Sequence, residues 1–127
     1  MIGARHLRLA GRAVRHAPSP IHPFEVQAVL HNACDLKCLY CRCPEHPIRT
    51  LTTVEWRRTI QALAACGTLR IKFQGGEPTL RPDFSILCAE AKAAGLTTAV
   101  ISHGGRIAQK PGLLDGLDEV VITLDAR

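Results

Sequence analysis

Three cysteines lie close together in the segment CDLKCLYC, at Cys34, Cys38 and Cys41. Thiolates at such short spacings are typical metal ligands, and three is an odd number for a disulfide framework. A closed tetrahedral zinc site needs four protein ligands, whereas three thiolates on a cubane iron–sulfur cluster leave one iron open. An open metal position is typical of a catalytic site. The spacing therefore favours an iron–sulfur centre over a structural metal.

Zinc remains an alternative at this stage. Cys43 follows the three cysteines closely and would supply a fourth thiolate, and His46 is also near in sequence. Zinc knuckles usually pair two short Cys-x-x-Cys spacings across a longer gap, and this sequence has no second pair. A third interpretation, buried core cysteines, fits poorly because the segment has charged and small neighbours.

A second short motif, Gly75-Gly76-Glu77-Pro78, has the composition of a ligand-binding loop. Glycines adopt backbone conformations closed to other residues and let the chain approach a ligand closely, while proline stiffens the exit. Glu77 adds a carboxylate suited to a cation such as a ligand ammonium. Taken alone, the tetrapeptide also fits an ordinary turn.

The elements that must position these motifs alternate between strand and helix patterns. Apolar alternation and β-branched runs predict strands, at 24–32, 69–73, 96–102 and 119–125. Helical periodicity with capping signals predicts helices between them, at 52–67, 81–95 and, interrupted by Pro111, 106–117. Alternating strands and helices indicate βα units in an α/β fold with a parallel sheet.

The unusual short motifs all follow predicted strands. The cysteines follow the first strand, GGEP the second, SHGG the third, and TLDAR closes the fourth. Ligand sites of parallel α/β sheets gather at the carboxyl ends of the strands. The sequence therefore predicts one site built from four loops.

The cysteine spacing, with Tyr40 before the third cysteine and Gly75 to Pro78 about one βα unit later, resembles the radical S-adenosylmethionine (radical SAM) superfamily. The resemblance runs from about residue 25 to the end of the sequence. It implies a partial TIM-like barrel, of which this sequence carries about four of about six βα units. We therefore expect a truncated partial barrel over residues 24–127.

The resemblance also implies the cofactors. Cys34, Cys38 and Cys41 would bind a [4Fe-4S] cluster whose unique iron chelates the amino and carboxylate groups of S-adenosylmethionine. One electron, from a reduced ferredoxin or flavodoxin-type donor, would cleave the sulfonium to give methionine and a 5′-deoxyadenosyl radical that abstracts a substrate hydrogen. Tyr40 would lie by the adenine, and Gly75, Gly76, Glu77 and Pro78 would hold the methionine amino group. The substrate stays open.

The later loops match the family less closely. Ser102-His103-Gly104 stands where members often have a Thr-Asn-Gly-like turn, and Thr123-Leu124-Asp125 resembles a family Ser-Leu-Asp. By this match Ser102 and Thr123 are candidate cofactor ligands. His103 replaces the amide, and it is either a hydrogen-bonding partner of ligand or substrate or a solvated loop residue.

The other cysteines have separate interpretations. Cys66 closes a predicted helix and Cys88 lies on an apolar helical stripe, so both are expected to be structural. Cys43 is expected to lie beside the cluster without binding it.

Charge and composition limit the classes of partner and location. The net charge is +5, and residues 1–22 hold Arg5, Arg8, Arg12 and Arg15 without an acid, so the rest is near neutral. With few aromatic residues and no basic-aromatic interleaving, nucleic-acid binding is not expected. Residues 1–23 are predicted to form a basic helix and a proline-rich linker. We see no secretory signal or membrane span, so the expected location is the cytoplasm.

The sequence ends at the fourth predicted strand, which would leave an apolar open edge for a partner or a further segment to cover. A cavity that excludes water is needed for radical chemistry, so we expect the isolated chain to bind a cluster more readily than it turns over substrate. The alternatives are a non-catalytic zinc or iron–sulfur binding module and an inert or partner-dependent fragment.

Overall fold

The computed structural model describes residues 22–124 of the chain. The predicted basic helix and most of the linker, within residues 1–21, lie outside the described residues, as do residues 125–127. Across the described part of the chain, none of the helices is both long and apolar enough to cross a membrane.

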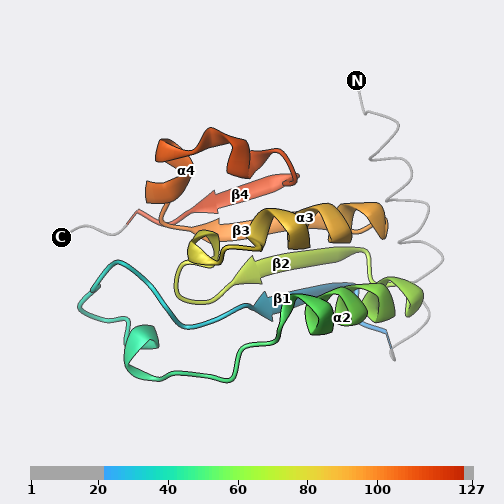
Figure 1. Cartoon of the computed structure of the whole chain (residues 1–127), viewed down its shortest axis with the longest axis horizontal. Helices are drawn as coiled ribbons and strands as arrows, with labels where there is room; N and C mark the ends of the chain where they lie inside the picture. The colour runs from blue at the N-terminus through green and yellow to red at the C-terminus, as the bar shows by residue number, and fades with distance from the viewer. Residues whose placement is uncertain (1–21, 125–127) are drawn as a thin grey trace.

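Four parallel strands form one sheet, in the spatial order β1-β2-β3-β4. The strands are β1 (Glu25–Val29), β2 (Arg70–Gln74), β3 (Thr97–Ser102) and β4 (Glu119–Ile122). Their arrowheads point the same way in Figure 1, so the loops that follow them gather at one edge. The predicted α/β fold with a parallel sheet is confirmed.

Two helices cover one face of this sheet. They are α2 (Thr53–Ala65) and α3 (Phe84–Ala93), which lie side by side in front of the strands in Figure 1. The apolar stripe predicted for the second helix is buried, at Phe84, Leu87, Cys88 and Ala91. The Phe73 ring of β2 meets Phe84 edge to face, with centroids 5.9 Å apart. Burial of these apolar side chains fixes the sheet against the helices.

Several predicted boundaries move, and proline explains two of the changes. The helix predicted from residue 81 begins at Phe84, because Arg81, the residue before Pro82, is extended with a ψ of 125° after a separate 3₁₀ turn, η2 (Pro78–Leu80). The helix predicted over 106–117 is two short pieces, α4 (Gly105–Gln109) and η3 (Pro111–Leu114). Proline at the start of η3 lacks the N–H that a continuous helix would need.

The strand ends move as well. The first strand ends at Val29 instead of residue 32, since the chain then turns toward the loop after β2. The last strand ends at Ile122 instead of residue 125. Val121 and Ile122 are exposed on β4, which has one strand partner, β3, among the described residues.

The start of α2 carries the capping box that the sequence predicted. The Thr52 hydroxyl accepts a hydrogen bond from the Glu55 N–H at 3.2 Å, and the Glu55 carboxylate accepts one from the Thr52 N–H at 2.7 Å. These bonds satisfy backbone groups that the first helical turn leaves without partners. They also fix where the long loop from the cysteines enters the helix.

We predict that Thr52→Ala lowers the free energy of unfolding by about 1 kcal/mol, because it removes the capping hydroxyl. Urea denaturation monitored by circular dichroism measures the change. Thr50→Ala is the matched control, since Thr50 is exposed and precedes the helix. Equal denaturation midpoints for the two variants would contradict the prediction.

Candidate functional site

The loops after β1, β2 and β3 meet at the carboxyl edge of the sheet, on the left of Figure 1. The long loop after β1 carries Cys34, Cys38 and Cys41, and we call residues 34–41 the cysteine loop. The predicted convergence of these loops is confirmed by hydrogen bonds between them.

Backbone hydrogen bonds join the segment before the cysteine loop to the GGEP loop. The Gly76 N–H donates to the His31 carbonyl and the Glu77 N–H donates to the Ala33 carbonyl, each at 2.8 Å. A Cβ atom on Gly76 would lie 2.1 Å from the Ala33 carbonyl oxygen, and one on Gly75 would lie 2.1 Å from the His31 carbonyl oxygen. Gly75 also has a φ of +143°, which favours glycine. The two glycines are therefore needed for this close approach.

Glu77 is fully buried and its carboxylate faces inward. Oε1 accepts hydrogen bonds from the Thr79 N–H at 3.1 Å and the Thr79 hydroxyl at 2.5 Å. The Ser102 hydroxyl lies 2.9 and 3.0 Å from the two oxygens, and the His103 N–H donates to Oε2 at 3.0 Å. Donors from two loops thus satisfy a buried charge that would otherwise be costly.

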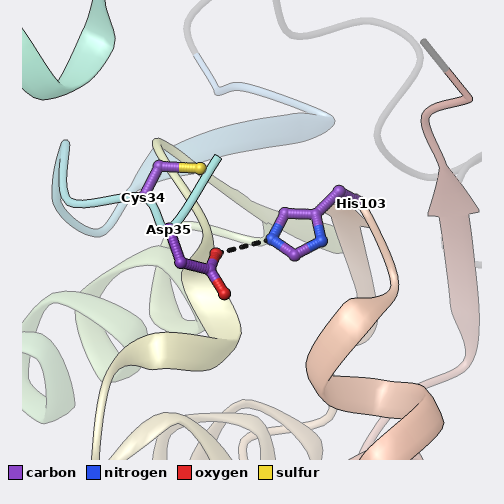
Figure 2. Close-up of side chains that lie close together, drawn as sticks. All are labelled: Cys34, Asp35 and His103. Carbon is purple, nitrogen blue, oxygen red and sulfur yellow. Dashed lines mark hydrogen bonds and ion pairs between the residues drawn. The ribbon is translucent and has the colours of Figure 1, made fainter. Parts of the chain in front are cut away.

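Ser102 and His103 therefore form hydrogen bonds with other residues of the chain. The Ser102 hydroxyl, besides contacting Glu77, accepts a hydrogen bond from the Gly104 N–H at 2.9 Å. The His103 side chain is only 13% exposed, and its Nε2 lies 2.8 Å from Asp35 Oδ1 and 3.2 Å from Glu77 Oε2. Figure 2 shows the His103 ring and the Asp35 carboxylate pointing toward each other beside Cys34. Of the two alternatives left open for His103, the solvated loop residue does not fit this arrangement.

The cysteine loop is partly open to solvent. Cys34 and Cys38 are half-buried and Cys41 is exposed. The Cys41 N–H donates to the Cys38 carbonyl at 3.1 Å, which forms a tight turn between these two residues. Cys34 Sγ accepts a hydrogen bond from the Leu36 N–H at 3.4 Å, although burial raises the pKa of Cys34 overall. Three thiols on one accessible loop fit the donor set of an iron–sulfur cluster.

The remaining cysteines divide into two groups. Cys43 is half-buried beside the loop, and a hydrogen bond with Cys41 raises the pKa of Cys43. Cys88 lies in the core, where burial raises the pKa of its thiol to about 12. Cys66 is exposed and caps the end of α2. Cys88 on α3 and Cys66 at the end of α2 thus lie outside the cysteine loop.

The other predicted site residues lie around the same edge. Tyr40 is 71% exposed on the cysteine loop, and Pro78 is buried at the start of η2. Thr123 follows β4, is exposed, and donates its N–H to the Ser102 carbonyl at 3.0 Å. Contacts of these residues with a cofactor stay predictions.

Sequence reasoning missed two residues that take part in the hydrogen bonds of this site. Asp35 hydrogen-bonds to His103, which lowers the pKa of the Asp35 carboxyl, and Thr79 gives two hydrogen bonds to Glu77. A polar residue directly after a ligand cysteine was a weak available signal for Asp35. The Glu-x-Thr pattern was a weak signal for Thr79.

A cavity of about 640 Å³ lies between the end of β1 and the starts of α2 and α3. Its lining includes His31, Leu51 and Arg81, but none of the three loop cysteines. The Arg81 guanidinium is already bound to Asp83 at 2.6 Å and to the Leu51 carbonyl at 2.8 Å. The cavity is therefore distinct from the thiols of the cysteine loop.

Comparison with protein families gives one match over most of the chain. The model of the radical SAM superfamily matches residues 29–126. The matched range includes the three loop cysteines and the GGEP motif. The match starts at residue 29, close to residue 25, where the resemblance described from the sequence begins.

Two curated enzymes illustrate the sequence similarity. PqqA peptide cyclase of Methylorubrum extorquens (strain PA1) is 35% identical over 118 residues, which are 85% of this chain and 31% of that enzyme. GTP 3′,8-cyclase of Chlorobaculum tepidum is 38% identical over 106 residues, which are 79% of this chain and 32% of that enzyme. The chain thus spans about a third of the length of these relatives.

Solved structures show the same fold. BtrN, crystallised with AdoMet and 2-DOIA, has a TM-score of 0.72 at 15% identity and matches 83% of this chain and 47% of its own. Streptococcus suis SuiB, crystallised with S-adenosylmethionine, has a TM-score of 0.66 at 20% identity and matches 87% of this chain and 26% of its own. Both alignments support the partial-barrel architecture.

We predict that Gly76→Ala lowers the free energy of unfolding by about 1–3 kcal/mol, because the new methyl group would collide with the Ala33 carbonyl. Gly112→Ala is the control, since its Cβ would meet nothing closer than Asp115 Oδ2 at 3.7 Å. Urea denaturation compares the two variants with the parent chain. Unchanged stability in Gly76→Ala would contradict the close approach of the two loops.

Proposed function

Because this chain belongs to the radical SAM superfamily, we propose that it is the cluster-binding part of a radical SAM enzyme. A [4Fe-4S] cluster and S-adenosylmethionine are the cofactors characteristic of that family. The observation that carries the proposal is the pair of backbone hydrogen bonds between the GGEP loop and the segment just before Cys34. This bonding places the two family motifs side by side.

In this proposal Cys34, Cys38 and Cys41 hold the cluster. When bound, the cluster supplies the electron that cleaves S-adenosylmethionine into methionine and a 5′-deoxyadenosyl radical, which abstracts a hydrogen from the substrate. Three protein thiolates leave one iron for the amino and carboxylate groups of the cofactor. Cys43, beside Cys41, stays outside the ligand set.

The methionine amino group is assigned to the GGEP loop. Gly75 and Gly76 let this loop pass close to the segment before Cys34, which brings its backbone next to the cysteine loop. The buried Glu77 carboxylate supports this role chiefly by fixing the loop, because its oxygens already accept bonds from Thr79, Ser102 and His103. Its negative charge also favours a nearby ammonium. Pro78 fixes the exit of the loop.

Tyr40, Ser102 and Thr123 complete the proposed cofactor pocket. The exposed Tyr40 ring is assigned to the adenine. The Thr123 side chain is exposed at the end of β4 and is assigned to the carboxylate or ribose of the cofactor. Ser102 is buried, so its contribution runs through Glu77 and the turn at Gly104.

A peptide is the first substrate class to test. PqqA peptide cyclases are relatives by sequence, and SuiB has been crystallised with its precursor peptide SuiA. The electron donor in the proposal is a reduced ferredoxin or flavodoxin-type protein. Dithionite replaces that donor in the experiments below.

Anaerobic reconstitution with iron and sulfide tests the cluster. We expect the parent chain and the Cys66→Ala control to gain [4Fe-4S] absorption and, after reduction, an EPR signal. The triple variant Cys34→Ala, Cys38→Ala, Cys41→Ala should gain neither. The proposal is wrong if the parent shows no signal or if the triple variant shows the same one. Stoichiometric zinc that requires Cys43 would instead support a zinc module.

A second experiment separates an enzyme from a passive cluster protein. We expect S-adenosylmethionine to change the EPR spectrum of the reduced cluster, because it binds the open iron directly. We also expect 5′-deoxyadenosine to form only when dithionite and S-adenosylmethionine are both present, and more slowly than cofactor binding. An unchanged spectrum together with no 5′-deoxyadenosine would favour the non-catalytic binding module. Liquid chromatography with mass spectrometry quantifies the product.

A further inference from the structure

We propose that His103 is a positioning residue that fixes the first cysteine of the cysteine loop before any cofactor binds. It does so by clamping Asp35, the neighbour of Cys34, against the loops after β2 and β3. This inference rests on the proposed function for its purpose, but the clamp itself is a property of the protein alone.

The hydrogen bonds of His103 define its proton positions. The Gly105 N–H lies 3.1 Å from Nδ1, and an amide N–H donates only, so Nδ1 is the acceptor. The ring proton therefore sits on Nε2, which faces Asp35 Oδ1 at 2.8 Å and Glu77 Oε2 at 3.2 Å. The shorter distance assigns the bond chiefly to Asp35.

Packing around the ring shows that this position is built for it. A Cβ atom on Gly105 would lie 2.9 Å from His103 Cε1 and 3.1 Å from Nδ1, so the glycine leaves the room that the ring occupies. Gly104, with a φ of +81°, turns the chain directly after the histidine. The ring is held between this turn and the cysteine loop, as Figure 2 shows.

The clamp acts on Cys34 because Cys34 is anchored on both sides. On one side the Ala33 carbonyl accepts a hydrogen bond from the Glu77 N–H, and on the other the Asp35 carboxylate accepts one from His103 Nε2. One potential metal-ligand atom from each of Cys34, Asp35 and His103 lies within 4.8 Å of the other two. Holding both neighbours limits the backbone rotation that would turn the Cys34 thiol away. A ligand ordered in advance loses less conformational entropy when the metal group binds.

Two amide variants separate the two halves of the clamp. In His103→Gln the side-chain amide nitrogen stands close to the position of Nε2 and can still donate to Asp35. In His103→Asn the shorter amide stands close to Nδ1, so it can keep the Gly105 contact but does not reach Asp35. Comparing the two variants therefore isolates the hydrogen bond to Asp35, because both keep a polar side chain at position 103.

Hydrogen exchange in the full, metal-free chain provides the test, with mass spectrometry resolving peptides that cover residues 34–41. We expect exchange there to be roughly tenfold faster in His103→Asn and in Asp35→Ala, because each change removes one hydrogen bond to a charged group. The double variant should be no faster than either single one. His103→Gln should exchange like the parent, as should the control His46→Ala, which alters an exposed side chain after the cysteine loop.

Three outcomes would overturn the clamp: equal exchange in His103→Asn and His103→Gln, additive effects in the double variant, or faster exchange spread over the whole sheet. As a second readout, cluster incorporation should be slower in His103→Asn than in His103→Gln at equal unfolding free energy. Failure of the parent chain to take up any cluster would reject the proposed function. The exchange result in metal-free protein would still decide the clamp.

Discussion

The buried carboxylate of Glu77 is the constraint on which the rest of the site depends. An ionised group without solvent contact needs hydrogen-bond donors around both oxygens, since an unpaired buried charge is strongly unfavourable. Here the donors come from Thr79 in the same loop, from Ser102 at the end of β3 and from His103 directly after it. The loops after β2 and β3 must therefore keep one relative position, and the carboxylate charge stays at the carboxyl edge of the sheet.

This arrangement extends to the cysteine loop through two different kinds of contact. Backbone hydrogen bonds to Gly76 and Glu77 hold the segment before Cys34, and they require glycine because the chains approach so closely. A side-chain hydrogen bond from His103 then holds Asp35 after it. Rigid supporting contacts of this kind are what metal sites need, because the orientation of a ligand depends on the groups that hold it.

Local sequence patterns predicted the strands, the two long helices and the motifs, because each of these depends on nearby residues. The capping box at Thr52 and Glu55, for example, joins positions only three residues apart. The Asp35–His103 bond joins residues 68 positions apart, and no local pattern reports such a pairing. The same limit applies to Glu77, which the motif alone predicts to face a ligand cation, since its inward orientation depends on Ser102 and His103.

The two ends of the sheet divide stability from function. At the amino ends of the strands, Arg70 of β2 pairs with Glu25 of β1 at 3.0 Å and with Glu119 of β4 at 2.7 Å. Lys72 adds a second ion pair to Glu25 at 3.1 Å. These partly exposed pairs carry little energy singly, but together they link β1, β2 and β4 at the end away from the cysteine loop. Because the strands are parallel, the loops at the other end are left free to be specialised, with glycines, buried charge and thiols that would be poor choices for stability alone.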